Sequence, residues 1–418
     1  MNRCWLAEVR YAILVGIVLM LMQAAPGHAQ FVGYDWALGL RHQSARVGDG
    51  EGGEFSSVDS LGASVEFYHQ IGDTVLTYRG AVGAAYSAQR GIAFAPLPED
   101  LIVYPGLTGV GVLRKPPIRA GAWLEAELGR LALDEPSGLL FSDTISIEPV
   151  QLADGMRVAW RWPGSDVAVT VAYLGLLDAA IDRISAHPDP DQLPNSANAI
   201  ALVTLGAREL VAQQDGSLVL LARYDFAREM EREGSYFLGV VATGPIMHRV
   251  DQQTALIGAL STSDNPRLDG VSLLLSAQAT YRPDTVWIGS LWSQLRYASG
   301  GANLARFPEL AGPNVGTAFA EKLSDIVSLE LGAGHDLGVA PRGAVLSPEL
   351  ALRLFLVPSG EPTARTGVDP SGRFAGFEVS PSIRYHLIRG LDVASNAAFL
   401  FANDRVRSLI GFEGRISL

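Results

Sequence analysis

The chain of 418 residues contains a single cysteine, Cys4, close to its N-terminus. Without a second cysteine it builds neither an internal disulfide scaffold nor a thiolate metal site. Lysine is also scarce, since it occurs only at Lys115 and Lys322, and charged residues make up 18% of the chain. The net charge of −12 argues against the basic surface that nucleic-acid binding requires. We therefore expect no nucleic acid among the partners.

Long apolar runs are missing as well, because after residue 29 no stretch approaches the roughly 20 uninterrupted apolar residues of a spanning helix. Helix-period stretches are absent too. A hydrophobic content of 48% and a mean hydropathy of +0.19 exclude disorder. These absences leave a β-rich chain with widely distributed apolar residues.

The N-terminal segment has the features of a secretory signal peptide. Arg3 and Arg10 precede an apolar stretch from Tyr11 to Met22, and a small-residue cleavage site follows at Ala29. The apolar stretch is too short for a comfortable anchor helix. We predict a cleaved signal peptide over residues 1–29 and one domain over residues 30–418, with no cysteine left to carry a lipid anchor.

Strict alternation of apolar and polar residues is the dominant local pattern, and it places one kind of side chain on each face of a strand. In residues 156–162, the apolar positions are Met156, Val158, Trp160 and Trp162, and they alternate with Arg157, Ala159 and Arg161. The segments 74–89, 271–281 and 377–387 alternate in the same way. The fold class is therefore predicted to be all-β.

Three features favour a transmembrane barrel over a soluble sandwich. Aromatic residues such as Tyr78, Trp160 and Tyr281 lie near the ends of the apolar faces, as in the aromatic girdles of outer-membrane barrels. The segments run 10 to 15 residues, which is long enough to cross a membrane when tilted. Short turns, near residues 70–73, 163–165, 213–216, 282–284 and 388–390, alternate with long loops at 43–56, 132–152, 176–197, 300–321 and 358–373.

We predict an antiparallel transmembrane β-barrel of about 18 strands with both termini in the periplasm. The predicted strands are 31–42, 57–70, 73–88, 101–113, 119–131, 153–162, 166–175, 198–211, 216–227, 235–244, 250–262, 270–282, 285–299, 322–337, 345–357, 374–387, 391–402 and 405–418. The segment 101–113 is the weakest because it contains Pro105 and several glycines, so a 16-stranded barrel is the second choice.

The C-terminal strand carries Ile410, Phe412, Ile416 and Leu418 on one face. It resembles the terminal strand that outer-membrane proteins present to the barrel-assembly machinery, although that strand usually ends in Phe or Trp. The resemblance implies an outer-membrane protein of a Gram-negative bacterium, with membrane lipid and this machinery as partners.

The polar faces carry similar numbers of arginines and acidic residues. The candidate pore-lining residues are Arg79, Glu125, Glu127, Arg157, Arg161, Arg223, Asp225, Arg296 and Arg384. One interpretation pairs these charges across strands as ordinary sheet chemistry. The other takes Arg157, Arg161, Arg223 and Arg296 as a basic ladder for anionic solutes, since arginine matches carboxylate and phosphate well. Genomic base composition is a further possible reason for the many arginines.

The loop from Leu133 to Gln151 is predicted to fold partly into the pore. It contains the apolar triplet Leu139, Leu140 and Phe141, which would be unfavourable on an exposed outer loop. The alternative is a surface loop whose triplet packs on neighbouring loops.

Catalysis, a metal site and a cofactor are not expected. The sequence contains no GxSxG, HExxH, P-loop or EF-hand spacing. Ser382 and His386 share a strand face but lie about 13 Å apart at 3.3 Å per residue, which is too far for a hydrogen bond.

Residues 128–138 (LGRLALDEPSG), followed by Asp154, Gly155, Met156 and Arg157, resemble the central hairpins of porins of the alginate-export type, and Tyr297 to Gly300 is similar to a strand end in such barrels. The resemblance covers about a fifth of the chain and implies a passive outer-membrane channel. The expected cargo is a small polar or anionic solute, or an exported polysaccharide. A scaffold barrel of an envelope export machine is the alternative, an outer-membrane enzyme the second alternative, and homo-oligomers are possible.

Overall fold

The computed structural model describes residues 29–48, 54–71, 74–90, 101–104, 110–115, 122–133, 135–141, 152–174, 198–211, 213–225, 233–263, 269–285, 287–300, 304–308, 319, 324–339, 343–360, 373–387, 390–402 and 405–417. The predicted signal peptide lies outside these residues, apart from its last position. In the described part of the chain, no helix has the length and apolar character needed to span a membrane.

Antiparallel strands account for most of the described residues. They are β1 (Ala29–Gly48), β2 (Glu54–Ile71), β3 (Thr74–Arg90), β4 (Leu101–Tyr104), β5 (Val110–Lys115), β6 (Trp123–Ala132), β7 (Leu152–Trp162), β8 (Ser165–Leu174), β9 (Asn198–Val211), β10 (Gln214–Asp225), β11 (Glu233–Met247), β12 (Val250–Ser263), β13 (Gly270–Tyr281), β14 (Ser290–Ala298), β15 (Ile326–Gly334), β16 (Leu337–Val339), β17 (Ala344–Leu356), β18 (Phe374–Leu387), β19 (Leu391–Ala402) and β20 (Arg405–Ser417). These segments form one 20-stranded sheet, which confirms the predicted all-β class.

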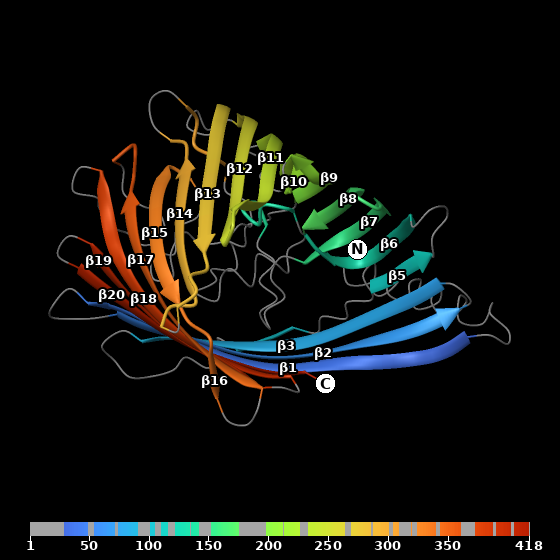
Figure 1. Cartoon of the computed structure of the whole chain (residues 1–418), viewed down its shortest axis with the longest axis horizontal. Coiled ribbons are helices and arrows are strands. Elements are labelled where there is room, and N and C mark those ends of the chain that lie inside the picture. The colour runs from blue at the N-terminus through green and yellow to red at the C-terminus, as the bar shows by residue number, and fades with distance from the viewer. Residues whose placement is uncertain are drawn as a thin grey trace, which may run out of the picture.

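The sheet closes on itself into a barrel. Successive strands pair along the chain, and β1 pairs both with β2 and with the last strand, β20, where Ala37 lies opposite Ser417. Figure 1 shows β1 and β20 side by side and the middle strands arching over them. Two interruptions occur: β4 and β5 both pair with β3, and β15 and β16 both pair with β17.

One end of the barrel collects the short turns and both ends of the sheet. Pro163 and Gly164 connect β7 to β8, and Gly164 has a φ of +91°, which glycine adopts without strain. At this same end Ala29, the first strand residue, pairs with Ile71, which precedes a short connection to β3. The long connections after β6, β8, β14 and β17 leave from the opposite end. The predicted alternation of short and long connections is therefore present.

The interruptions have local causes. Pro105 and two glycines follow β4, so the predicted strand 101–113 is broken into β4 and β5. The predicted strand 322–337 also breaks, because β17 presents Pro348 where β15 ends, and a proline has no amide hydrogen to donate. Here His335 N donates to the Pro348 carbonyl at 3.1 Å before β16 begins.

Two predicted connections have different lengths in the structure. The prediction of a long loop over residues 43–56 is wrong. β1 and β2 continue as a paired ribbon, in which Gln43 lies opposite Val58 and Val47 lies opposite Glu54. The expected turn 282–284 is longer, since β13 ends at Tyr281 and β14 begins only at Ser290. In the first place the polar residues of the strands resemble a loop, and in the second the apolar residues Trp287 and Ile288 resemble the start of a strand.

The two faces of the wall differ in exposure. In β11, Phe237 is 3% exposed, whereas its neighbour Leu238 is 56% exposed. We call inner the face of Phe237, because its side chain packs in the barrel with residues of the loop after β6 and with Phe307. Large apolar side chains such as Leu238 and Val271 cover the outer face, which water solvates poorly.

Candidate functional site

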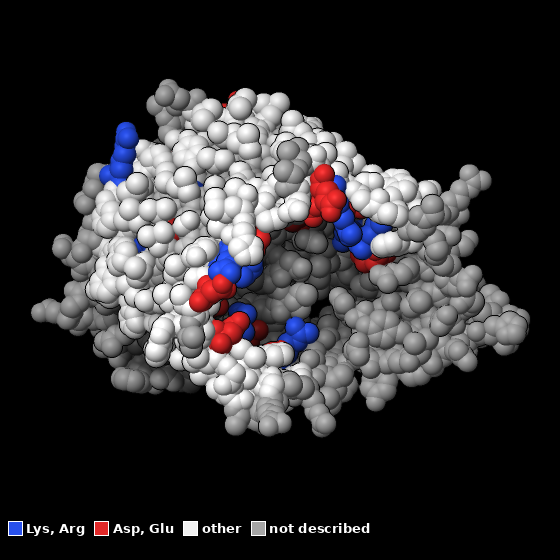
Figure 2. Space-filling view, viewed as in Figure 1, with Lys and Arg blue, Asp and Glu red and all other residues white. Residues whose placement is uncertain are grey.

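Charged residues on the inner faces of β6 and β7 form the first part of the candidate site. Alternation places Arg157 and Arg161 on the inner face of β7, because Met156 and Trp160 are exposed on the outer face. Arg161 forms an ion pair with Glu125 of β6, with 3.2 Å between Nη2 and Oε2. Figure 2 shows side chains of both signs gathered around a hollow in this view of the molecule.

Arg157 is held differently from Arg161. It lies opposite Glu127 in the β6–β7 register and opposite Thr170 in the β7–β8 register. Among the described residues no ion pair involves its guanidinium. Arg157 is therefore a positive charge of the inner wall that no described carboxylate neutralises at contact distance.

A second charged cluster spans β15, β17 and β18. Arg353 donates from Nε to Glu330 Oε2 at 2.8 Å and from Nη1 to Glu378 Oε1 at 2.7 Å. Glu378 is completely buried, and its other oxygen accepts the backbone N–H of Phe319 at 2.8 Å. Ser380 hydroxyl donates to the same carboxylate at 2.7 Å. This network fixes the charges of three adjacent strands.

Two segments at the loop end fold back onto the inner wall. Leu140 and Phe141 are each 1% exposed and belong to the same apolar cluster as Ile200, Leu202 and other inner-face residues. Gln253 of β12 donates from Nε2 to the carbonyls of Pro136 and Ser137, both at 3.3 Å. The predicted inward packing of the triplet 139–141 is therefore confirmed.

Glu135 organises this first segment. Its buried carboxylate accepts the backbone N–H groups of Ser137 at 2.7 Å, Leu139 at 2.6 Å and Leu140 at 2.9 Å. A turn from Glu135 to Gly138, where Gly138 has a φ of +64°, brings these N–H groups to one side. The segment 135–141 is thus held in a compact form before it reaches the wall. Sequence reasoning included Glu135 in the loop but gave it no role.

The second segment lies between β14 and β15. Phe307 packs edge-on against Phe237 at 5.8 Å, and Phe319 stacks on Phe355 at 4.3 Å between ring centroids. At its base, buried Asp325 accepts a hydrogen bond from the hydroxyl of Ser359 and lies 3.5 Å from Nη2 of Arg306. Both segments therefore occupy space inside the barrel.

The remaining predicted site residues have varied positions. Arg223 lies on the inner face of β10, and Arg296 lies on the inner face of β14 with a buried Nε that has no hydrogen-bond partner in the described structure. Arg384 is exposed near the short-turn end of β18. The structure does not describe the side chains of Arg79 and Asp225.

The four proposed ladder arginines do not occupy adjacent strands. Arg157 and Arg161 are on β7, Arg223 is three strands away on β10, and Arg296 is four strands further on β14. At about 4.8 Å per strand, these steps correspond to roughly 14 Å and 19 Å. The four arginines therefore do not form one continuous ladder.

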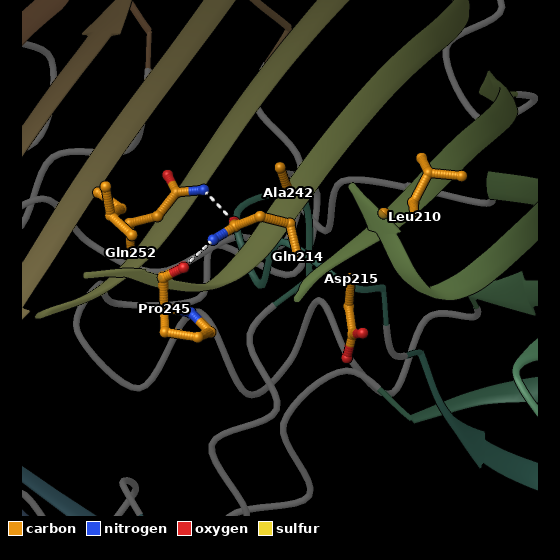
Figure 3. Close-up of a pocket in the computed structure, with 8 residues that line it drawn as sticks. Leu210, Gln214, Asp215, Ala242, Pro245 and Gln252 are labelled. Atoms are coloured by element: carbon orange, nitrogen blue, oxygen red, sulfur yellow. Dashed lines mark hydrogen bonds between the residues drawn. The ribbon is translucent and has the colours of Figure 1, made fainter. Parts of the chain in front are cut away.

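A cavity of about 490 Å³ lies at the short-turn end, lined mainly by residues of β9, β10 and β11 and by Gln252. Gln252 donates to Gln214 at 2.6 Å, and Gln214 donates to the Pro245 carbonyl at 2.5 Å, so the two amides point toward one another (Figure 3). Leu210 and Ile246 on its rim are exposed on the outer face. This cavity is therefore separate from the inner charged wall.

No group of acidic, histidine or cysteine side chains suited to a metal ion occurs within the described ranges. His386 hydrogen-bonds Asp392 across β18 and β19 at an exposed position. Ser382 lies four register positions away on the same strand, opposite Asn396.

No family model matches the sequence, and no curated protein matches it. Solved structures do match in fold. OccK5 (OpdH) of Pseudomonas aeruginosa has a TM-score of 0.58 at 14% identity, covering 92% of this chain and 98% of that chain. OccK2 (OpdF) of the same organism, solved with glucuronate, has a TM-score of 0.56 at 14% identity, covering 93% and 99%. The outer-membrane protein OprD of this organism has a TM-score of 0.52 at 12% identity, covering 94% and 96%.

The chain has an outer-membrane porin fold. The resemblance to alginate-export porins is not supported, because these similar structures belong to the OprD and Occ group. Its motifs are short: Gly129 and Arg130 of β6 lie directly opposite Gly155 and Asp154 of β7, as in an ordinary antiparallel pair. Such a pair occurs in barrels of many kinds.

Proposed function

We propose that this protein is an outer-membrane porin that lets small polar or anionic solutes diffuse across the membrane. The observation that carries the proposal is the division of one closed sheet into an apolar exposed outer face and an inner face with charged side chains. An outer face of this kind suits lipid, and a polar inner face suits an aqueous lumen.

The two inward segments favour small solutes over an exported polysaccharide. Segment 135–141 and the residues Phe307 and Phe319 belong to one apolar cluster that packs on the inner wall. They narrow the space through which a thick polymer would have to pass. An enzyme is not proposed, because the described inner-wall residues offer no nucleophile beside a histidine. A scaffold role would not require a narrowed lumen.

The number of strands in the barrel wall depends on how the two broken strands are counted. We assign β4 with β5, and β15 with β16, to single wall positions, because each pair shares one neighbouring strand. The barrel then has about 18 strands. We place the short-turn end and both termini in the periplasm, with a signal peptide cleaved near Ala29 and barrel assembly recognising β20.

The test is to purify the mature protein from the outer membrane, or refold it, and to measure current in a planar bilayer. We expect stepwise conductance increases and an outer-membrane location in cell fractions. A folded, heat-modifiable barrel that conducts no ions would contradict the channel, and would favour the scaffold role. Recovery in the soluble periplasm would contradict the membrane assignment.

A further inference from the structure

Trp292 lies against the backbone of β15 on the inner wall, in space that the glycines of that strand leave open. A Cβ atom at Gly332 would lie 2.1 Å from Cε2 and 2.2 Å from Cζ2 of the indole, and one at Gly334 would lie 3.4 Å from Cζ3. Both glycines are on the inner face, since Leu331 between them is 51% exposed outside. The wall covers the part of the indole that lies over Gly332, and the half-buried ring leaves another part of its surface toward the lumen.

The edge of the indole is also fixed. Its Nε1 donates to Glu330 Oε1 at 2.8 Å, and the other oxygen of Glu330 accepts from Arg353 Nε at 2.8 Å. Aromatic rings present a negative face that attracts weakly positive C–H groups. A fixed, half-buried indole is therefore a platform for the C–H face of a ring-shaped solute.

Hydrogen-bonding amides lie beside this platform. Gln278, Gln294 and Glu330 occupy consecutive cross-strand positions of β13, β14 and β15, and all three side chains are half-buried. Gln294 Nε2 donates to Gln278 Oε1 at 3.3 Å, which leaves further amide hydrogens and lone pairs for a ligand. Gln294 and Trp292 are two residues apart on the same face, roughly 7 Å along the strand.

Charges of both signs surround the platform. Glu330 and Glu378 are bonded to Arg353, Arg296 lies on β14, and Glu349 of β17 lies beside Gly334. Because the acids are at least as numerous as the arginines, this part of the wall does not favour a free anion, whereas its amides and carboxylates still bond hydroxyl groups. The combination of an aromatic surface with fixed amides and no excess of positive charge suits an uncharged ring that carries many hydroxyls.

We propose that Trp292, Gln294, Gln278 and Glu330 form a binding subsite for cyclic polyhydroxylated solutes of the pyranose type. One ring face stacks on the indole, and the hydroxyls bond the two amides and the free lone pairs of Glu330. The inference rests on the proposed channel function and names one solute class for it.

The test measures how D-glucose blocks the ion current of the full mature protein in a planar bilayer. We expect D-glucose to reduce the current in a saturable way, and cyclohexanecarboxylate, a ring without hydroxyls, to do so much more weakly. Trp292→Ala should raise the half-blocking glucose concentration roughly tenfold, which corresponds to loss of about 1.4 kcal/mol of ring contact. Gln294→Ala should raise it about threefold.

Trp160→Ala is the matched control, because Trp160 lies on the outer face and is 39% exposed. This variant should leave glucose block unchanged. Gly332→Ala keeps the tryptophan but displaces the ring, so it should weaken block as Trp292→Ala does. If a conducting channel is not blocked by glucose, or if block is equal in all variants, the subsite is refuted while the porin function stands. A folded barrel without conductance refutes the porin function itself.

Discussion

The inner wall over β6 and β7 and the inner wall over β15 to β18 both carry arginine and glutamate, but they hold them differently. Arg353 bonds two carboxylates, and one of these, Glu378, is completely buried. Arg157 lies opposite Glu127 without an ion pair in the described structure. Arg161 is intermediate, with a single contact to Glu125 at 3.2 Å.

The difference separates structural charges from charges that act on solutes. A guanidinium whose donors are used by buried carboxylates has a fixed position and a neutralised field, and its loss leaves those carboxylates unpaired. A guanidinium without such partners stays available to ions in the lumen. We infer that β15 to β18 contribute mainly rigidity and that β6 and β7 contribute mainly ion preference.

The largest expected effect comes from Arg353→Met. The variant leaves Glu330 and Glu378 without their shared cation, and breaking a buried pair of this kind costs roughly 3–5 kcal/mol. We expect a lower midpoint of urea unfolding, or failed assembly, measured by heat-modifiable mobility on gels. Arg157→Met is the matched control and should change the unfolding free energy by less than about 1 kcal/mol. Equal destabilisation by both substitutions would contradict the distinction between the two regions.

The alternation of residues predicted which face each of these side chains occupies, because a strand has a period of two. It placed Arg157 and Arg161 on the polar face, where the structure has them. The inward packing of Leu139 to Phe141 was also predictable, since an apolar triplet in a polar loop requires cover.

The partners of each charge were not predictable from the sequence. Arg353 donates hydrogen bonds to Glu330 and Glu378, which are 23 and 25 residues away in the sequence. These contacts depend on the cross-strand register. A register shift of one residue would move every side chain to the other face. The roles of Glu135 and Trp292 were missed for a similar reason, since each depends on backbone groups that are positioned only after folding. For Trp292, the sequence signal that could have been used was the pair of glycines at positions 332 and 334.

A smaller effect is expected for Glu135→Ala, which acts on the segment that narrows the lumen rather than on the wall. The backbone N–H groups of Ser137, Leu139 and Leu140 lose their common acceptor, and each unsatisfied donor costs about 1–3 kcal/mol if it stays buried. We expect segment 135–141 to loosen, with higher and noisier single-channel conductance but an unchanged unfolding midpoint. Deletion of residues 135–149 should raise conductance further.

Asp269→Ala serves as the control for Glu135→Ala. Asp269 is an exposed carboxylate that accepts one long hydrogen bond of 3.4 Å from Ser263 N. Conductance should not change in this variant. Unaltered conductance in a folded Glu135→Ala barrel would show that the segment does not limit the current.

The smallest expected effect is a change of ion preference in Arg157→Gln, measured as the reversal potential in a salt gradient. Removing a charge that no described carboxylate neutralises should shift the preference toward cations. Arg161→Gln should shift it in the same direction, because it removes a positive charge beside Glu125. Electrostatic screening acts over about 10 Å at 0.1 M salt and about 3 Å at 1 M. Both shifts should therefore shrink at high salt, and a shift that persists unchanged at 1 M would indicate an altered pore shape instead of a lost charge.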